Sequence, residues 1–157
     1  MRSRTFTPTR SQVWTAARFI AQSFPPRVLI VDDYIDSADA LAAFLATTGF
    51  ETRVAYNGGD VLAIANEWHP DSIVLDIAMP GVSGLAVARA LRESPATASV
   101  PLLAYTAYET GDNYAQLRDG GFDGVCAKPI DPLTVVEILA TFLGTAALNL
   151  AYSFRSS

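Results

Sequence analysis

The stretch DSIVLDIAMP, residues 71–80, constrains the fold of this chain more than any other. Residues 73–75 are apolar and largely β-branched, and so short a run predicts a buried strand. The run ends on a carboxylate, Asp76, and Pro80 soon makes the chain turn. Open α/β sheets bind ligands at the carboxyl ends of their strands, and a carboxylate is costly to bury there without a cationic partner. A cationic partner is therefore expected beside Asp76.

Five strand patterns alternate with five helical patterns between residues 27 and 144. Asp36 and Asp131 are expected to cap the first and last helices. This alternation predicts an α/β fold, a parallel and doubly wound sheet with helices on both faces. The strands are expected at 27–31, 52–55, 73–76, 100–106 and 122–126, and the helices at 36–48, 60–68, from 84 onward, 109–119 and from 131 onward.

Two segments flank this predicted domain, a basic N-terminal extension (1–26) and a C-terminal tail (145–157). Apolar residues recur at helical spacing within 11–24, which predicts a short amphipathic helix. Such a helix would pack on the domain or contact a partner or a second copy of the chain. The Arg-rich, acid-poor composition of the extension also fits an organelle transit peptide.

Charge and cysteine content narrow the classes of function. The formal net charge of −5 combines +4 in the extension with −9 in the rest of the chain. An acidic body argues against nucleic-acid binding. The single cysteine, Cys126, excludes an internal disulfide and gives no zinc cluster. No apolar run reaches the roughly 18 residues of a membrane span.

Polar residues stand where the predicted strands end. Asp32 and Asp33 follow the first strand, Asp76 ends the third, Thr106 ends the fourth, and Lys128 follows the fifth. The carboxyl ends of parallel strands share one edge of a sheet, so these side chains are expected to converge. Three carboxylates raise one another's pKa, and a magnesium ion with oxygen ligands relieves that repulsion. A hydroxyl and an ammonium, here the only lysine of the chain, suit the oxygens of a phosphoryl group.

In this order and on these elements, the motifs resemble the response-regulator receiver domain of two-component signalling, the CheY-like superfamily. The resemblance covers about residues 27–144 and implies a flavodoxin-like fold, with five parallel strands in the order 2-1-3-4-5. The motifs that carry it are Asp32-Asp33, Asp76 with Met79-Pro80 and Gly84, Thr106-Ala107, and Lys128-Pro129.

The resemblance assigns the acids to magnesium and phosphate chemistry. It implies that Asp76 is the phosphoacceptor. It implies that Asp33, Asp76 and the backbone carbonyl of Ala78 hold Mg²⁺, with Asp32 helping through water. The bond before Pro129 is expected to be cis.

The resemblance also implies that Thr106 and Lys128 contact the phosphoryl oxygens. Many receivers carry an aromatic switch three residues before the lysine, and this chain has Val125 there. Either the switch is absent or Tyr105 or Tyr108 takes its place.

The implied function is signalling rather than enzymology. A histidine kinase or histidine phosphotransfer protein in a bacterial cytoplasm would donate the phosphoryl group, and the domain would catalyse its own phosphorylation. Slow dephosphorylation is expected because Ala78 and Tyr108 occupy the positions that flank the attacking water. No output domain follows the last predicted helix, so a stand-alone receiver acting through protein contacts is expected. The downstream target and a homodimer remain open.

Three other classes were weighed against this interpretation. A haloacid-dehalogenase-type phosphatase needs a second aspartate where this chain has Ala78, and a flavodoxin needs a Ser/Thr/Gly-rich phosphate loop where it has Asp32 and Asp33. The alternative that stays open is a receiver-like interaction module that is not phosphorylated. Such a module would lack one or more of the five site residues.

Overall fold

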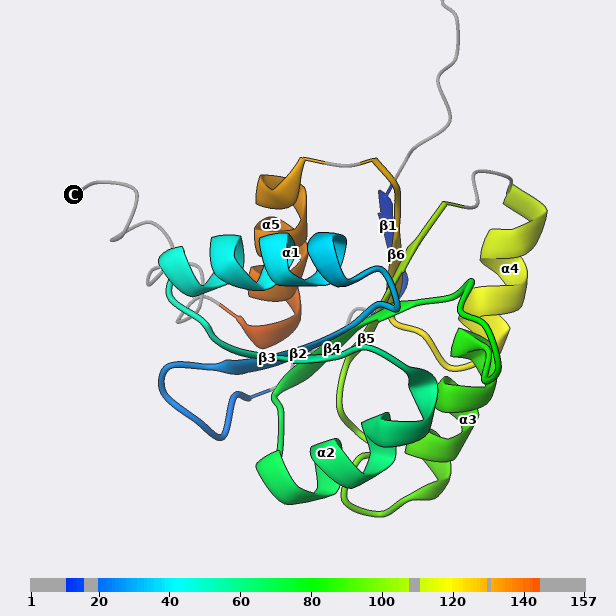
Figure 1. Cartoon of the computed structure of the whole chain (residues 1–157), viewed down its shortest axis with the longest axis horizontal. Coiled ribbons are helices and arrows are strands. Elements are labelled where there is room, and N and C mark those ends of the chain that lie inside the picture. Colours follow the sequence, from blue (N-terminus) through cyan, green and yellow to red (C-terminus); the bar gives the residue numbers. More distant parts are fainter. Residues whose placement is uncertain (1–10, 16–19, 108–110, 130, 145–157) are drawn as a thin grey trace, which may run out of the picture.

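The structure is a computed structural model that describes residues 11–15, 20–107, 111–129 and 131–144. Strands and helices alternate along most of this part of the chain (Figure 1). The elements are β1 (Ser11–Val13), β2 (Arg27–Val31), α1 (Ile35–Thr47), β3 (Glu51–Ala55), the 3₁₀ turn η1 (Gly58–Asp60), α2 (Val61–Trp68), β4 (Ser72–Asp76), α3 (Gly84–Glu93), β5 (Leu102–Thr106), α4 (Gly111–Asp119), β6 (Gly124–Ala127) and α5 (Pro132–Leu143).

The strands form one sheet in the order β1-β6-β5-β4-β2-β3. Strands β2 to β6 are mutually parallel and reproduce the predicted order 2-1-3-4-5. The predicted α/β fold with a doubly wound parallel sheet is therefore confirmed. A sixth strand, β1, was not predicted and pairs antiparallel with β6 at the edge of the sheet.

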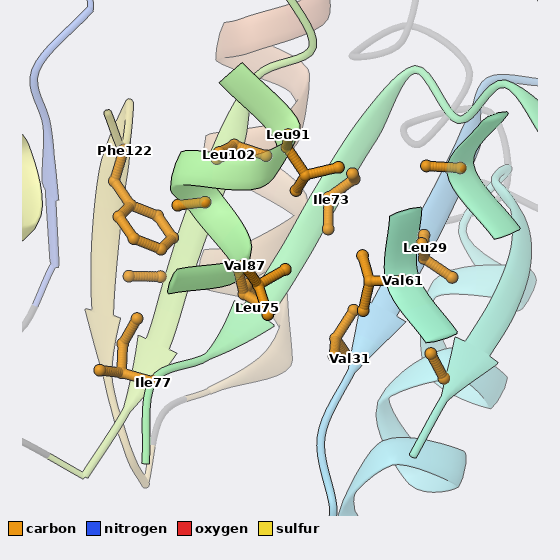
Figure 2. Close-up of a cluster of buried hydrophobic side chains, with 14 of the residues drawn as sticks. Leu29, Val31, Val61, Ile73, Leu75, Ile77, Val87, Leu91, Leu102 and Phe122 are labelled. Atoms are coloured by element: carbon orange, nitrogen blue, oxygen red, sulfur yellow. The ribbon is translucent and has the colours of Figure 1, made fainter. Parts of the chain in front are cut away.

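The helices cover both faces of the sheet, with α1 and α5 on one side and α2, α3 and α4 on the other (Figure 1). Alternate residues of the central strand β4 supply the two cores. Ile73 and Leu75 pack under α2 and α3, and Figure 2 shows them beside Val87 and Leu91 of α3. Val74 packs with α1 and α5 instead. All five residues of β4 are buried, as the apolar run predicts.

Of the two predicted helix N-caps, Asp36 and Asp131, the structure confirms only Asp131. The Asp131 side chain accepts a hydrogen bond from the backbone N–H of Leu133, which confirms that cap. The prediction for Asp36 is wrong. Tyr34 occupies the N-cap of α1 without a side-chain hydrogen bond, and Asp36 lies in the first turn. The turn is instead fixed by Asp32, whose carboxylate accepts the backbone N–H of Tyr34 at 2.9 Å.

The predicted amphipathic helix at 11–24 is also wrong. Residues 11–13 form β1, residues 20–24 are not helical, and residues 16–19 lie outside the described part. The free edge of β6 offers backbone hydrogen bonds that an isolated short helix cannot match, so sheet pairing overrides the helical pattern. Beyond β1 the indole of Trp14 meets Tyr114 of α4 edge-to-face at 6.5 Å.

Trp14 and Gln22 contact residues that precede β6 and β4, at the opposite ends of these strands from the carboxyl ends. The contacts there include hydrogen bonds from the backbone N–H of Trp14 to the carbonyl of Asp123 at 2.8 Å and from the N–H of Gln22 to the Asp71 carboxylate at 2.7 Å. The N-terminal segment is therefore tied to the body of the domain at β6 and again just before β4.

Trp14 and Ile20 distinguish the strand from the predicted helix. Both would line the apolar face of that helix, whereas in the structure Trp14 packs on the core and Ile20 is 83% exposed. We expect Trp14→Ala to lower the free energy of unfolding by about 1–2 kcal/mol, because a partly buried aromatic is removed. Ile20→Ala, the control, should change it by less than about 0.5 kcal/mol. Urea unfolding checks both, and equal losses would contradict the observed path of the segment.

Candidate functional site

The carboxyl ends of the parallel strands bring the predicted site residues to one edge of the sheet. Asp32 follows β2, Asp76 is the last residue of β4, Thr106 is the last residue of β5, and Lys128 follows β6. The backbone N–H of Lys128 donates to the carbonyl of Thr106 at 2.6 Å, which ties the two neighbouring strand ends together. The backbone of Thr106 thus lies at the same edge of the sheet as the acids and Lys128, as expected.

Three carboxylates form a cluster at this edge. Asp32, Asp33 and Asp76 each offer an oxygen, and these oxygens all lie within 4.8 Å of one another. Asp32 and Asp76 are buried, at 1% and 5% exposure, and Asp33 is exposed. Such a set fits Mg²⁺, which takes hard oxygen ligands and keeps several waters on its open side.

Lys128 is the cation that meets the buried acids. Its ammonium donates a hydrogen bond to Asp32 Oδ2 at 2.9 Å and lies 3.6 Å from Asp76 Oδ2. The same ammonium stands over the ring of Tyr105, with Nζ 4.9 Å from the ring centroid. Burial of the two carboxylates is therefore compensated by one lysine that both of them share.

The two buried carboxylates differ in their affinity for a proton. Burial raises the pKa of Asp76 to about 6, and the negative charge of Asp32 adds to that effect while Lys128 opposes it. Burial would also raise the pKa of Asp32, but the hydrogen bonds from Lys128 and from the Tyr34 N–H lower it below the ordinary value. For Lys128, burial would lower the pKa, and the hydrogen bond to Asp32 with the charge of Asp76 raises it instead. Of the two buried carboxylates, Asp76 therefore has the higher pKa.

The turn after β4 positions Asp76 through its backbone. The N–H of Ala78 donates to Asp76 Oδ1 at 3.2 Å, so one carboxylate oxygen is fixed by the chain itself. Helix α3 begins against this turn, because a Cβ at Gly84 would lie 2.6 Å from the carbonyl oxygen of Asp76 and 2.7 Å from Cα of Ile77. Only glycine allows that close approach. The sequence identified Gly84 as the start of the helix, and the structure shows the contact that requires it.

The position of the expected aromatic switch is filled by a core residue. Val125 is fully buried and packs in the cluster under α2, α3 and α4. Tyr105 lies half-buried beneath Lys128, and Tyr108 falls outside the described residues. Cys126 is fully buried, and burial raises the pKa of its thiol to about 12, so it is an inert core residue at neutral pH. The Lys128–Pro129 bond is cis, as expected.

The contact between Tyr105 and Lys128 was not predicted from the sequence. The signal that could have found it is the strand register, because Tyr105 pairs with Asp76 on one side and with Cys126 on the other. A residue in that row must lie between the acid of β4 and the lysine that follows β6.

A family model for the response regulator receiver domain matches residues 28–140. Among curated proteins, the chain is 32% identical over 122 residues to the polar-differentiation response regulator DivK of Brucella anthropi, an alignment that covers 78% of this chain and 99% of the relative.

Solved structures give the same likeness in three dimensions. The chemotaxis protein CheY4 of Vibrio cholerae superposes with a TM-score of 0.72 at 28% identity, covering 75% of this chain and 98% of that one. A putative response regulator from Chloroflexus aurantiacus superposes with a TM-score of 0.72 at 29% identity, covering 76% and 98%. Within the described residues, no helix is long and apolar enough to cross a membrane.

The raised pKa of Asp76 predicts how the free energy of unfolding of the metal-free protein depends on pH. Its folded pKa of about 6 exceeds the ordinary 3.8, so ionised Asp76 costs folding free energy above about pH 6. Below about pH 4 the carboxyl is protonated in both states and the cost is absent. Asp76→Asn should therefore stabilise the metal-free protein by about 1–3 kcal/mol at pH 7.5, and the gain should shrink towards zero as the pH falls to 4.

The measurement is denaturant unfolding in a chelating buffer across that pH range. Asp36→Asn is the control, because Asp36 is exposed and lies in the first turn of α1, where a negative charge favours the helix. It should not stabilise the protein. If Asp76→Asn were less stable than the wild type at pH 7.5, ionised Asp76 would not cost folding free energy and the prediction would be wrong.

Proposed function

The chain belongs to the response-regulator receiver family, and from this premise we propose that it accepts a phosphoryl group on Asp76 in a magnesium-dependent reaction. The donor is a histidine kinase or a histidine phosphotransfer protein, and the signal passes onward by protein contact. The observation that carries the proposal is the cluster of three carboxylates, whose oxygens lie within 4.8 Å of one another, together with the lysine that contacts the two buried ones, Asp32 and Asp76. We propose residues 27–144 as the receiver domain, flanked by the N-terminal extension (1–26) and the tail (145–157), in a cytoplasmic setting.

The proposed nucleophile is a carboxylate oxygen of Asp76. It forms a bond to phosphorus as the bond between phosphorus and the donor's imidazole nitrogen breaks. The imidazole keeps the electron pair of that bond and leaves as the neutral ring after it takes a proton. The product on this chain is an acyl phosphate. The hydrogen bond from the Ala78 N–H to Asp76 Oδ1 holds the carboxylate still during the attack.

The charge that accumulates on the phosphoryl oxygens needs cationic partners. Lys128 already lies 3.6 Å from Asp76 and can neutralise part of that charge without leaving the site. Thr106, fully buried at the end of β5, is proposed as a hydroxyl contact to one oxygen. Asp32, Asp33, Asp76 and the carbonyl of Ala78 are the proposed magnesium ligands, with Asp32 acting through water. Bound there, the ion would supply additional positive charge to the same oxygens.

The direct test is labelling by a small phosphoryl donor such as acetyl phosphate. We expect the intact mass to increase by one phosphoryl group in the presence of magnesium and to stay unchanged in a chelating buffer or in Asp76→Asn. Asp36→Asn, which removes an exposed acid outside the cluster, should be labelled like the wild type. Equal labelling of Asp76→Asn would exclude Asp76 as the acceptor. No labelling of any variant, by this donor or by a kinase, would instead favour an interaction module that is not phosphorylated.

We further propose that the phosphoryl group is lost slowly. Hydrolysis needs a water aligned with the bond between Asp76 and phosphorus, and polar side chains two positions after the acceptor and two after the threonine can orient it. Here these positions hold Ala78, which offers no side-chain hydrogen bond, and Tyr108, which lies outside the described residues. Ala78→Asn combined with Tyr108→Glu should shorten the lifetime by about tenfold or more.

Decay of the phosphorylated mass at neutral pH in excess magnesium measures that lifetime. Ala78→Ser with Tyr108→Phe is a milder control and should decay at a rate closer to the wild type. A wild type that loses its phosphoryl group within seconds, or a double variant that decays no faster, would refute the proposed role of these two positions.

A further inference from the structure

The path of the Lys128 side chain crosses a neighbouring strand. Lys128 follows β6, but its ammonium meets Asp76 at the end of β4, and β5 lies between these two strands. Residues in register across parallel strands present their side chains on the same face of the sheet. Tyr105 is the β5 residue in register with both Asp76 and Cys126, the residue two positions before Lys128. Whatever stands at position 105 therefore lies beside the lysine where it crosses β5.

The contact between the Lys128 ammonium and Tyr105 is a cation–π interaction, which requires an aromatic ring. Nζ of Lys128 lies 4.9 Å from the centroid of the Tyr105 ring, within the roughly 6 Å over which a ring face attracts a cation. The ring is half-buried and packs against the hydrophobic cluster beneath α1 and α5, so its position is fixed by the core. The ammonium therefore has three contacts, each from the end of a different strand. They are the ring of Tyr105, the Asp32 carboxylate at 2.9 Å and the Asp76 carboxylate at 3.6 Å.

We propose that Tyr105 is a positioning residue that holds the Lys128 ammonium at the phosphorylation site through the face of its ring. This inference rests on the function proposed above. A lysine has a flexible four-carbon stem and many rotamers that point to solvent. The ring favours the rotamers that keep the ammonium beside Asp76, so the cation is in place before the phosphoryl group arrives. The ring face carries this role and the hydroxyl does not.

The role cannot fall to position 125 in this chain. Val125 has no ring, and its side chain packs in the cluster on the opposite face of the sheet from the one that Tyr105 contacts. Tyr105 therefore acts on the lysine directly, from the strand beside it.

A resonance of the lysine itself provides a test without phosphorylation. Lys128 is the only lysine of the chain, so labelling with ¹³C-lysine gives a single ε-methylene signal. A ring face beneath the ammonium shifts that signal upfield. We expect the upfield shift in the wild type and in Tyr105→Phe, and its loss in Tyr105→Leu and Tyr105→Met, which fill similar space without a ring. Thermal unfolding identifies any variant that does not fold. Two variants without a ring are used, so that the test can still be read if one of them does not fold.

The kinetic test asks whether Tyr105 acts through Lys128. With acetyl phosphate and saturating magnesium, Tyr105→Leu should be phosphorylated about two- to tenfold more slowly than the wild type, and Tyr105→Phe within about twofold of it. In a Lys128→Ala background, Tyr105→Leu should have no further effect, because the partner of the ring is gone. A merely structural role of Tyr105 would slow both backgrounds equally.

The outcomes separate the two proposals. An unshifted methylene signal in the wild type, or the same rate loss with and without Lys128, overturns the role of Tyr105 and leaves the function intact. A wild type that is never labelled overturns the function, and the methylene signal still decides whether the ring holds the lysine.

Discussion

The shared ion pair of Lys128 with Asp32 and Asp76 is the interaction on which the rest of the structure depends. Two carboxylates of almost no exposure lie at the ends of neighbouring strands, and burial of charges without a partner is costly. Lys128 reaches both because its backbone is fixed to Thr106 and its stem crosses β5. The parallel sheet is what makes this compensation available, since only its strand order brings residues 32, 76 and 128 to one edge.

A buried acid away from the site, Asp123, shows how a carboxylate with a structural role is bonded. Asp123 begins the turn into β6 at the opposite end of the strands, and it accepts hydrogen bonds from Arg92 and from the Leu102 N–H at 2.8 Å each. Thr15 of the N-terminal segment donates to the same carboxylate. This acid is fully engaged by groups of its own chain. Asp76 instead has one backbone donor at 3.2 Å and a lysine at 3.6 Å, and its pKa is raised. The contrast marks Asp76 as the acid with capacity left for a ligand.

The sequence predicted what depends on strand ends and on periodicity. Asp32, Asp76, Thr106 and Lys128 could be assigned to one edge because each follows an apolar strand, and a parallel sheet aligns those ends. Prediction from the sequence was wrong where tertiary contacts override the local pattern of residues. Residues 11–24 have helical spacing, yet the edge of β6 recruits residues 11–13 as a strand. Asp36 resembles a cap, yet the turn uses Asp32. The contact of Tyr105 with Lys128 was also missed, because it follows from the register between strands rather than from the local sequence pattern.

The most direct test of the central claim is the chemical identification of the phosphorylated residue. Borohydride reduces an aspartyl phosphate to homoserine, so treatment of the phosphorylated protein followed by peptide mass mapping marks the acceptor. The account predicts homoserine at position 76 and unmodified aspartate at 32 and 33, in protein labelled with magnesium present. Homoserine at position 32 or 33, or a phosphoryl group on any residue outside the cluster, would contradict it.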